Sequence, residues 1–226
     1  NELTFAYGNR APRQAVTYGL EAYTLIQDEP ADSVYAATRQ WLGSAYRGLG
    51  MLDSAEYYLS ESLAINVELG EKRATAINQF NLSTVYIEQL RNEEALALLL
   101  EACSYFEENE LRTYLNLVPA LGTLYRRMGQ DEQARTVMEK GLETARQQTD
   151  RDPIGEAFLL VNLAKVVSTA PFSDDSLGII YNLEAAETFR TYGLANPLRA
   201  TLNDLAATYV ELDQFAPALP IYAESL

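Results

Sequence analysis

The chain has 226 residues, of which 48% are apolar and 22% charged, a balance typical of ordinary globular proteins. Its 17 basic and 32 acidic residues give a formal net charge of −15, which disfavours binding to nucleic acid and to anionic membranes. The chain contains no histidine and one cysteine, so the commonest general acid-base group and an internal disulfide are both excluded. The sequence therefore predicts no enzyme, no cofactor and no metal site.

No segment is long and apolar enough to suggest a membrane span, and no cationic-then-apolar signal peptide opens the chain. We expect a soluble protein and favour the cytoplasm, although a single cysteine fits a reducing or an oxidising compartment. The chain starts abruptly at Asn1 and stops at Leu226 within sequence of helical character. We therefore expect a piece of a longer protein.

Residues 1–30 and 34–70 introduce a repeating pattern. Within 34–70, the run Trp41-Leu42-Gly43-Ser44-Ala45-Tyr46 is followed by Gly50 and then by Ala55. Ala15 lies 40 residues before Ala55 and predicts the second helix of an incomplete repeat over 1–30. Asp53, followed three residues later by Glu56, has the spacing of a capping box at the start of a helix.

The next two segments, 73–109 and 112–149, repeat the pattern. In the first, Asn81-Leu82-Ser83-Thr84-Val85-Tyr86 precedes Ala95, and in the second, Ala120-Leu121-Gly122-Thr123-Leu124-Tyr125 precedes Gly129 and Ala134. Each segment therefore predicts two helices joined by a short turn. Cys103, near the end of the second helix of 73–109, is expected to be inert packing.

The last two segments, 154–194 and 197–226, keep the leucine and the small residue after it. Asn162-Leu163-Ala164-Lys165-Val166-Val167 has valine where tyrosine is expected, and the polar stretch 168–175 widens its turn before Gly178. That turn is either a surface insertion or a contact point for a partner. In 197–226, Asp204-Leu205-Ala206-Ala207-Thr208-Tyr209 precedes Ala218.

The leucines at 42, 82, 121, 163 and 205 are spaced by 40, 39, 42 and 42 residues. Spacings of three and four within each copy place the apolar, small and aromatic residues on one helical face. Repeats of this length, each one helix pair, stack into a solenoid. We predict a single domain over 1–226: an all-α, right-handed superhelical solenoid of antiparallel helix pairs, with about five and a half repeats.

The pattern resembles the tetratricopeptide repeat family, whose signature is carried here by Leu42, Gly43, Tyr46, Gly50 and Ala55 and again by residues 121–134. The step of about 40 residues is longer than the common form. It is more similar to the long-repeat branch of bacterial regulators, kinesin light chains and spindle-orientation adaptors. The resemblance implies that the first helix of every pair lines a concave trough.

In the family, the trough positions fall two before, one before, two after and five after the anchoring leucine. Carried onto this chain, they and one adjacent arginine give the candidate ligand-binding residues Gln40, Trp41, Ser44, Arg47, Phe80, Asn81, Thr84, Thr123, Arg126, Arg127, Asn162, Lys165 and Asn203.

Several of these candidates have two readings. Asn81 and Asn162 precede their leucines directly, where family members that bind peptides use asparagine to hold a ligand's backbone, but a locally bonded amide is equally open. The cations Arg47, Arg126 and Lys165 favour a ligand with carboxylates or phosphate, unless acids such as Glu88 and Asp204 pair with them. Trp41 and Phe80 are apolar anchors for a ligand or ordinary core between repeats.

The leading hypothesis is a protein- or peptide-binding module, the sensing or recruiting part of a signalling or transcription-regulatory protein. Its partner would be a protein or peptide segment, with an acidic one favoured, and neither nucleic acid nor membrane. The alternatives are a self-associating scaffold, with a homodimer through ends that lack polar caps, and a small-molecule sensor.

Overall fold

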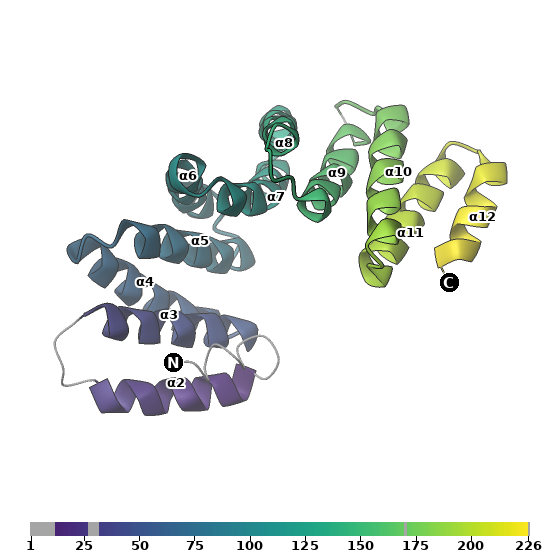
Figure 1. The fold of residues 1–226 in the computed structure, drawn as a ribbon. Coiled ribbons are helices and arrows are strands. Elements are labelled where there is room, and N and C mark those ends of the chain that lie inside the picture. Colours follow the sequence, from purple (N-terminus) through teal and green to yellow (C-terminus); the bar gives the residue numbers. More distant parts are fainter. Residues whose placement is uncertain (1–11, 27–31, 170, 226) are drawn as a thin grey trace. The chain divides into compact units, whose positions relative to one another are not determined.

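The computed structural model describes residues 12–26, 32–169 and 171–225, and these are helical apart from short turns (Figure 1). The helices are α2 (Pro12–Ile26), α3 (Ser33–Gly48), α4 (Leu52–Glu68), α5 (Lys72–Glu88), α6 (Asn92–Asn109), α7 (Leu111–Arg127), α8 (Asp131–Arg146), α9 (Pro153–Val167), α10 (Asp175–Thr191), α11 (Ala195–Glu211) and α12 (Phe215–Ser225). None of the helices in this part of the chain is both long and apolar enough to cross a membrane.

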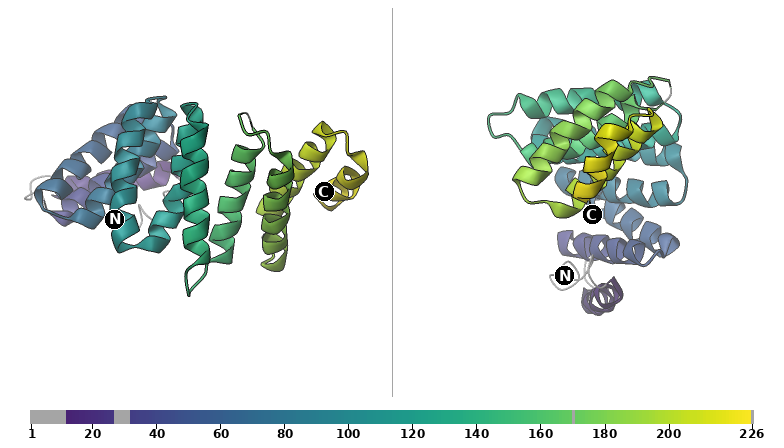
Figure 2. Two further views of the ribbon diagram at one scale, coloured as in Figure 1. Left: turned by 90° about the horizontal axis from the view of Figure 1, so that it is seen from above. Right: turned by 90° about the vertical axis from the view of Figure 1, so that its right-hand side faces the viewer.

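The chain divides into two compact units, residues 1–111 and residues 112–226. In the first unit α3 pairs with α4 and α5 with α6, and α2 and α4 each also pack on the helix that follows. In the second unit α9 pairs with α10 and α11 with α12, and the further views of Figure 2 show the same succession of helices. The predicted all-α fold of stacked helix pairs is confirmed.

The repeated apolar residues form the core of each unit. The anchoring leucines are 0–3% exposed, and so are the alanines of the second helices, Ala55, Ala95, Ala134 and Ala218. Ala15 of α2 is also fully buried, as expected for the second helix of an earlier repeat. Because each helix contributes one apolar face, every pair closes its core only against its neighbours.

The small residue after each leucine sits where paired helices come close together. A Cβ added to Gly43 would lie 2.6 Å from Cγ of Leu59 and 3.1 Å from the backbone oxygen of Ala55 on α4. A Cβ on Gly122 would overlap Met138 on α8. Glycine therefore sets the short distance between these helices, as the repeat pattern predicted.

The turns between paired helices are closed by backbone geometry. Gly50 and Gly129 have φ angles of 73° and 71°, and the next residue donates its N–H to the tyrosine carbonyl of the preceding helix, at 3.0 Å from Met51 to Tyr46. Leu90 adopts the same left-handed conformation, with φ of 64°. These hydrogen bonds satisfy carbonyls at the helix ends.

The predicted capping box at Asp53 is wrong. Helix α4 begins at Leu52, two residues earlier than a cap at Asp53 requires, with Met51 at the N-cap and no side-chain cap, and Asp53 lies in the first turn. Side-chain caps are found instead at Asp32, Asp152 and Asp174, whose carboxylates accept backbone hydrogen bonds at 2.9 to 3.1 Å. The turn glycine fixes the chain before α4, so this helix starts without a polar cap.

Within the wide turn of 168–175, residue 170 lies outside the described residues. The described part of this turn packs against neighbouring helices of its own unit. The ring centre of Phe172 lies 4.9 Å from the guanidinium carbon of Arg135 on α8, and Asp174 caps α10. Gly178, at the start of α10, lies so close to Ser168 that a side chain there would overlap it.

Candidate functional site

The first unit places its candidate ligand-binding residues on α3 and α5. Arg47 of α3 and Glu88 of α5 form an ion pair of 3.0 Å, which joins the two first helices across the repeats. Gln40, Trp41 and Ser44 on α3, and Phe80, Asn81 and Thr84 on α5, are all half-buried. This face of the unit therefore consists of polar and aromatic groups that water reaches in part; we call it the inner face of α3 and α5.

The two candidate asparagines differ in their hydrogen bonding. The amide nitrogen of Asn162 donates to the carbonyl of Phe158 in its own helix at 2.8 Å, which is the local bonding that the sequence left open. The side chain of Asn81 has no hydrogen bond with the described residues, and its backbone carbonyl accepts one from Thr84 at 2.6 Å. The side-chain donor and acceptor of Asn81 are thus not used within the described residues.

The second unit places candidates on α7, α9 and α11. Lys165 of α9 pairs with Asp204 of α11 at 3.0 Å, as Arg47 does with Glu88. Glu88 and Asp204, the two acids expected as alternative partners, thus each form an ion pair with one of the candidate cations. Arg126 is half-buried and Arg127 exposed, and neither forms an ion pair with the residues that the structure describes. Thr123 and Asn203 are exposed.

A cation that sequence reasoning missed lies between α2, α3 and α4. Arg39 is 4% exposed, and its guanidinium lies 3.9 Å from the ring centre of Tyr35 and 4.7 Å from that of Tyr23. Its Nε donates to Glu61 at 2.8 Å and its Nη2 to the Tyr35 hydroxyl at 2.7 Å. Burial lowers the pKa of Arg39, but hydrogen bonding to Tyr23 and the charge of Glu61 outweigh it and hold the pKa above its ordinary value.

Tyr23 also packs against Tyr58, which links the rings beside this cation to further tyrosines. Tyr46 and Tyr58 stack with their centres 5.4 Å apart, and Tyr57 meets Tyr58 edge-on at 5.1 Å. The cluster faces α2 and α4 rather than the inner face, so it acts in packing. Its sequence signal was an arginine one helical turn from Tyr35, in a segment unusually rich in tyrosine.

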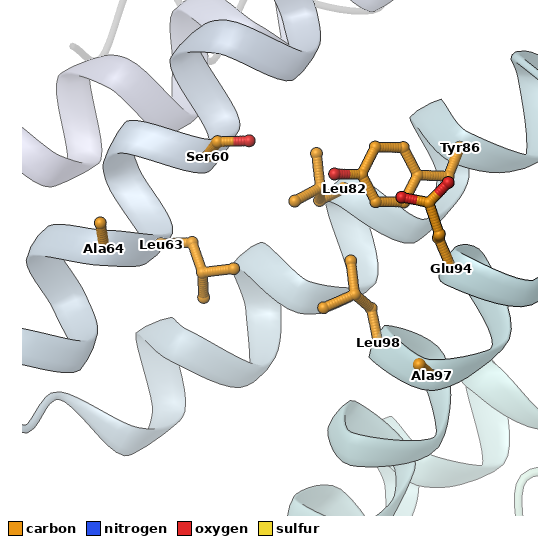
Figure 3. A pocket seen from close by; sticks show the side chains of 8 residues that line it. All are labelled: Ser60, Leu63, Ala64, Leu82, Tyr86, Glu94, Ala97 and Leu98. Carbon is orange, nitrogen blue, oxygen red and sulfur yellow. The ribbon is translucent and has the colours of Figure 1, made fainter. Parts of the chain in front are cut away.

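A groove of about 510 Å³ runs between α4 and α6 over α5 (Figure 3). Its walls are mostly apolar: Leu63, Leu82, Leu98 and the ring of Tyr86 surround it in the close-up. Ser60, Ala64, Glu94 and Ala97 complete the lining. A second groove of about 370 Å³ follows along the same helices and includes Gln79, Glu101 and Tyr105. The repeat pattern did not reveal either groove.

Cys103 is buried in α6, and burial raises the pKa of its thiol to about 12, with a smaller contribution from the nearby charge of Glu107. The thiol is therefore neutral at physiological pH and a weak nucleophile. Within the described ranges, no three acidic or cysteine side chains are grouped as metal ligands.

Sequence models of the tetratricopeptide repeat match residues 33–108 and residues 120–148. These segments are tetratricopeptide repeats. The match covers α3 to α6 and part of α7 with α8, so these tetratricopeptide repeats include the inner face of α3 and α5. No curated protein matches the sequence.

Solved structures with tetratricopeptide repeats share the fold at low sequence identity. BtubC (BKLC) from P. vanneervenii superposes with a TM-score of 0.78 at 17% identity, over 95% of this chain and 89% of that one. A Pyrococcus horikoshii signal transduction ATPase with a tetratricopeptide repeat sensor gives 0.79 at 17% identity, over 92% of this chain and 32% of that one. A Rap protein complexed with competence and sporulation factor gives 0.67 at 16%, over 98% and 60%. The fold of these solved structures thus covers more of this chain than the two matched segments do.

Proposed function

We propose that this chain is a protein- or peptide-binding module that holds its ligand on its first helices, at the inner face of α3 and α5 and at the corresponding face of α7, α9 and α11, which we also call an inner face. The observation that carries the proposal is the set of polar groups these faces leave without partners among the described residues: the side chain of Asn81 in the first unit, and Arg126 and Arg127 in the second. An enzyme is disfavoured, because the chain has no histidine and its one thiol is buried and neutral.

The chemistry of these groups favours a peptide segment with carboxylates. The amide of Asn81 can donate to and accept from a ligand's backbone. Arg126 and Arg127 can hold a carboxylate by charge-assisted hydrogen bonds. Arg47 and Lys165 contribute less than the sequence suggested, because Glu88 and Asp204 already offset their charge.

A sensing or recruiting role in a signalling or transcription-regulatory protein is the finer part of this proposal. Two of the structures with this fold support it: one is a sensor within a signal transduction ATPase, and the other is complexed with a competence and sporulation factor. A ligand that binds better to one spacing of the helix pairs would shift the population toward it and so act on an attached domain.

Affinity capture from native cell extract tests the proposal. The wild-type chain is compared with the triple variant Asn81→Ala, Arg126→Glu, Asn162→Ala, and the captured proteins are identified by mass spectrometry. The control is Arg146→Glu, which reverses a charge on α8, where Arg146 pairs with Glu184 on α10. We expect a protein retained by wild type and control and lost by the triple variant. Equal retention by all three, with circular dichroism showing them folded, refutes binding at the inner faces.

Self-association is a second candidate function, and α12 favours it. Phe215, Leu219 and Tyr222 of this helix are 56%, 69% and 39% exposed, which is a large apolar surface for one helix. Light scattering over a range of concentrations should show a dimer that Leu219→Glu abolishes. A monomer at every concentration excludes this candidate.

A further inference from the structure

The groove between α4 and α6 results from a change of side chains between consecutive repeats. A step of 40 residues takes Tyr57 to Ala97 and Tyr58 to Leu98, and it takes Tyr23 to Leu63. In the earlier repeat these three tyrosines pack together beside α3, with Tyr23 and Tyr58 edge-on at 6.5 Å. Alanine and leucine at the later positions leave the corresponding space open as the groove of about 510 Å³.

The same step removes a positive charge. Arg39, which pairs with Glu61, becomes Gln79, which donates a hydrogen bond to Glu101. Glutamine satisfies an oxygen of Glu101 but does not offset its charge. Glu101 therefore has no ion pair with the residues that the structure describes, although Lys72 also lines the second groove.

The two helices that flank the grooves carry acidic side chains and no basic ones. Helix α4 has four acidic residues and α6 has five, and neither has a lysine or arginine. Arg91, in the turn before α6, pairs with Glu56 and Glu94, but Glu68 and Glu93 have no ion pair with the described residues. Of the acids on these helices, Glu94 lines the first groove beside its partner Arg91, and Glu101 lines the second groove.

The dimensions fit a helix. Both grooves lie along α6 between Glu94 and Tyr105, a distance of about 16 Å at 1.5 Å per residue, which accommodates about three helical turns. Small residues on both edges, Ala64 and Ala97, permit the close approach of a backbone. A helix that lays one apolar face into such a groove is a common mode of recognition.

We propose that the groove between α4 and α6 binds a basic amphipathic helix of a partner protein. Its leucine-like side chains would occupy the space beside Leu63, Leu82 and Leu98, and its lysines or arginines would face Glu101. This surface is separate from the inner face of α3 and α5, so it would serve a second partner or a second segment of the same partner.

The probe is a fluorescent synthetic peptide of about 14 residues, with leucines three and four positions apart and lysines beside them. Two further peptides replace the lysines with glutamate or the leucines with glutamine. The decisive variant is Ala97→Tyr, which restores the residue of the preceding repeat and so fills the groove with a side chain the fold already accepts there. Leu100→Tyr is the matched control, since Leu100 lies on α6 but lines neither groove.

We expect fluorescence polarisation to show saturable binding of the lysine peptide alone, weakened at least tenfold by Ala97→Tyr and unchanged by Leu100→Tyr. Glu101→Gln should weaken it about threefold, and added salt should weaken it further. Ala64→Lys provides a second block if Ala97→Tyr does not fold. Equal binding to the blocked variants, or equal binding of the glutamate peptide, overturns the proposal. A wild-type dimer that Ala97→Tyr dissociates also overturns it, because the occupant is then a second copy.

Discussion

Gly43 offers the sharpest test of how closely the paired helices approach, because its surroundings do not adjust easily. In Gly43→Ala the new Cβ would lie 2.6 Å from Cγ of Leu59 and 3.1 Å from the Ala55 carbonyl oxygen, whereas carbon atoms normally pack at about 3.5 to 4.0 Å. The first is the branch point of a buried side chain and the second is backbone, so the helices must separate. Such overpacking costs about 1–3 kcal/mol, and the better helix propensity of alanine returns about 1.

Gly122→Ala is the matched comparison. There the nearest atoms all belong to the unbranched side chain of Met138, which can turn away through its rotatable bonds. We expect a cost of about 1 kcal/mol that the gain in propensity cancels. Gly43→Ala should therefore be less stable than wild type by about 1 kcal/mol and Gly122→Ala by close to 0.

Urea denaturation measures both. Trp41 is the only tryptophan and lies in α3, so its fluorescence reports the first unit, and circular dichroism reports all the helices. A neutral Gly43→Ala, or a larger loss of stability in Gly122→Ala, would refute the account of the helix contact.

Three further outcomes follow from single sites. Arg39→Ala should lower the free energy of unfolding by about 2–4 kcal/mol, because it removes a buried cation from Glu61 and two tyrosine rings. Arg47→Ala, at an exposed ion pair, should lower it by less than about 1 kcal/mol. Equal losses for the two variants in urea melts would contradict this. Leu90→Gly should raise the free energy of unfolding by about 0.5–1 kcal/mol, since Leu90 is 79% exposed and its φ of 64° is a strained conformation for leucine. Gly50→Ala should lower the free energy of unfolding, because it introduces the same backbone strain at a turn glycine. A destabilised Leu90→Gly would contradict this account of backbone strain. Cys103 should resist a thiol reagent in the folded protein up to about pH 9, because its raised pKa keeps the folded thiol neutral. The free energy of unfolding should fall between about pH 9 and 12, where the unfolded thiol ionises and the folded thiol does not. Rapid labelling at neutral pH would contradict this, since it would show an accessible thiolate.

The repeat step and the small residues of each copy were enough to predict the helix pairs and their close contacts. This succeeded because a residue such as Gly43 acts within its own pair, where local spacing decides the geometry. The start of α4 could not be predicted in the same way. Asp53 has the spacing of a capping box, but the left-handed conformation of Gly50 places Met51 at the N-cap instead.

The candidate site was only partly predictable. The pairing of Arg47 and Lys165 appeared as an alternative, because acidic residues lie near these positions in the next repeat. The local bond of Asn162 depends on its rotamer, which sequence does not specify. The groove at Ala97 depends on three helices together, so it becomes visible only when consecutive repeats are compared in the structure.

The most direct test of binding at the inner faces is photo-crosslinking from single positions of the second unit. Thr123→Cys and Asn203→Cys place a thiol-linked benzophenone on exposed sites of α7 and α11, and Glu187→Cys places it on α10 as the control, while the buried Cys103 stays unlabelled. Irradiation in native extract should crosslink one partner from Thr123 and Asn203 and none from Glu187. A partner crosslinked from Glu187 but from neither inner position would contradict the proposed function.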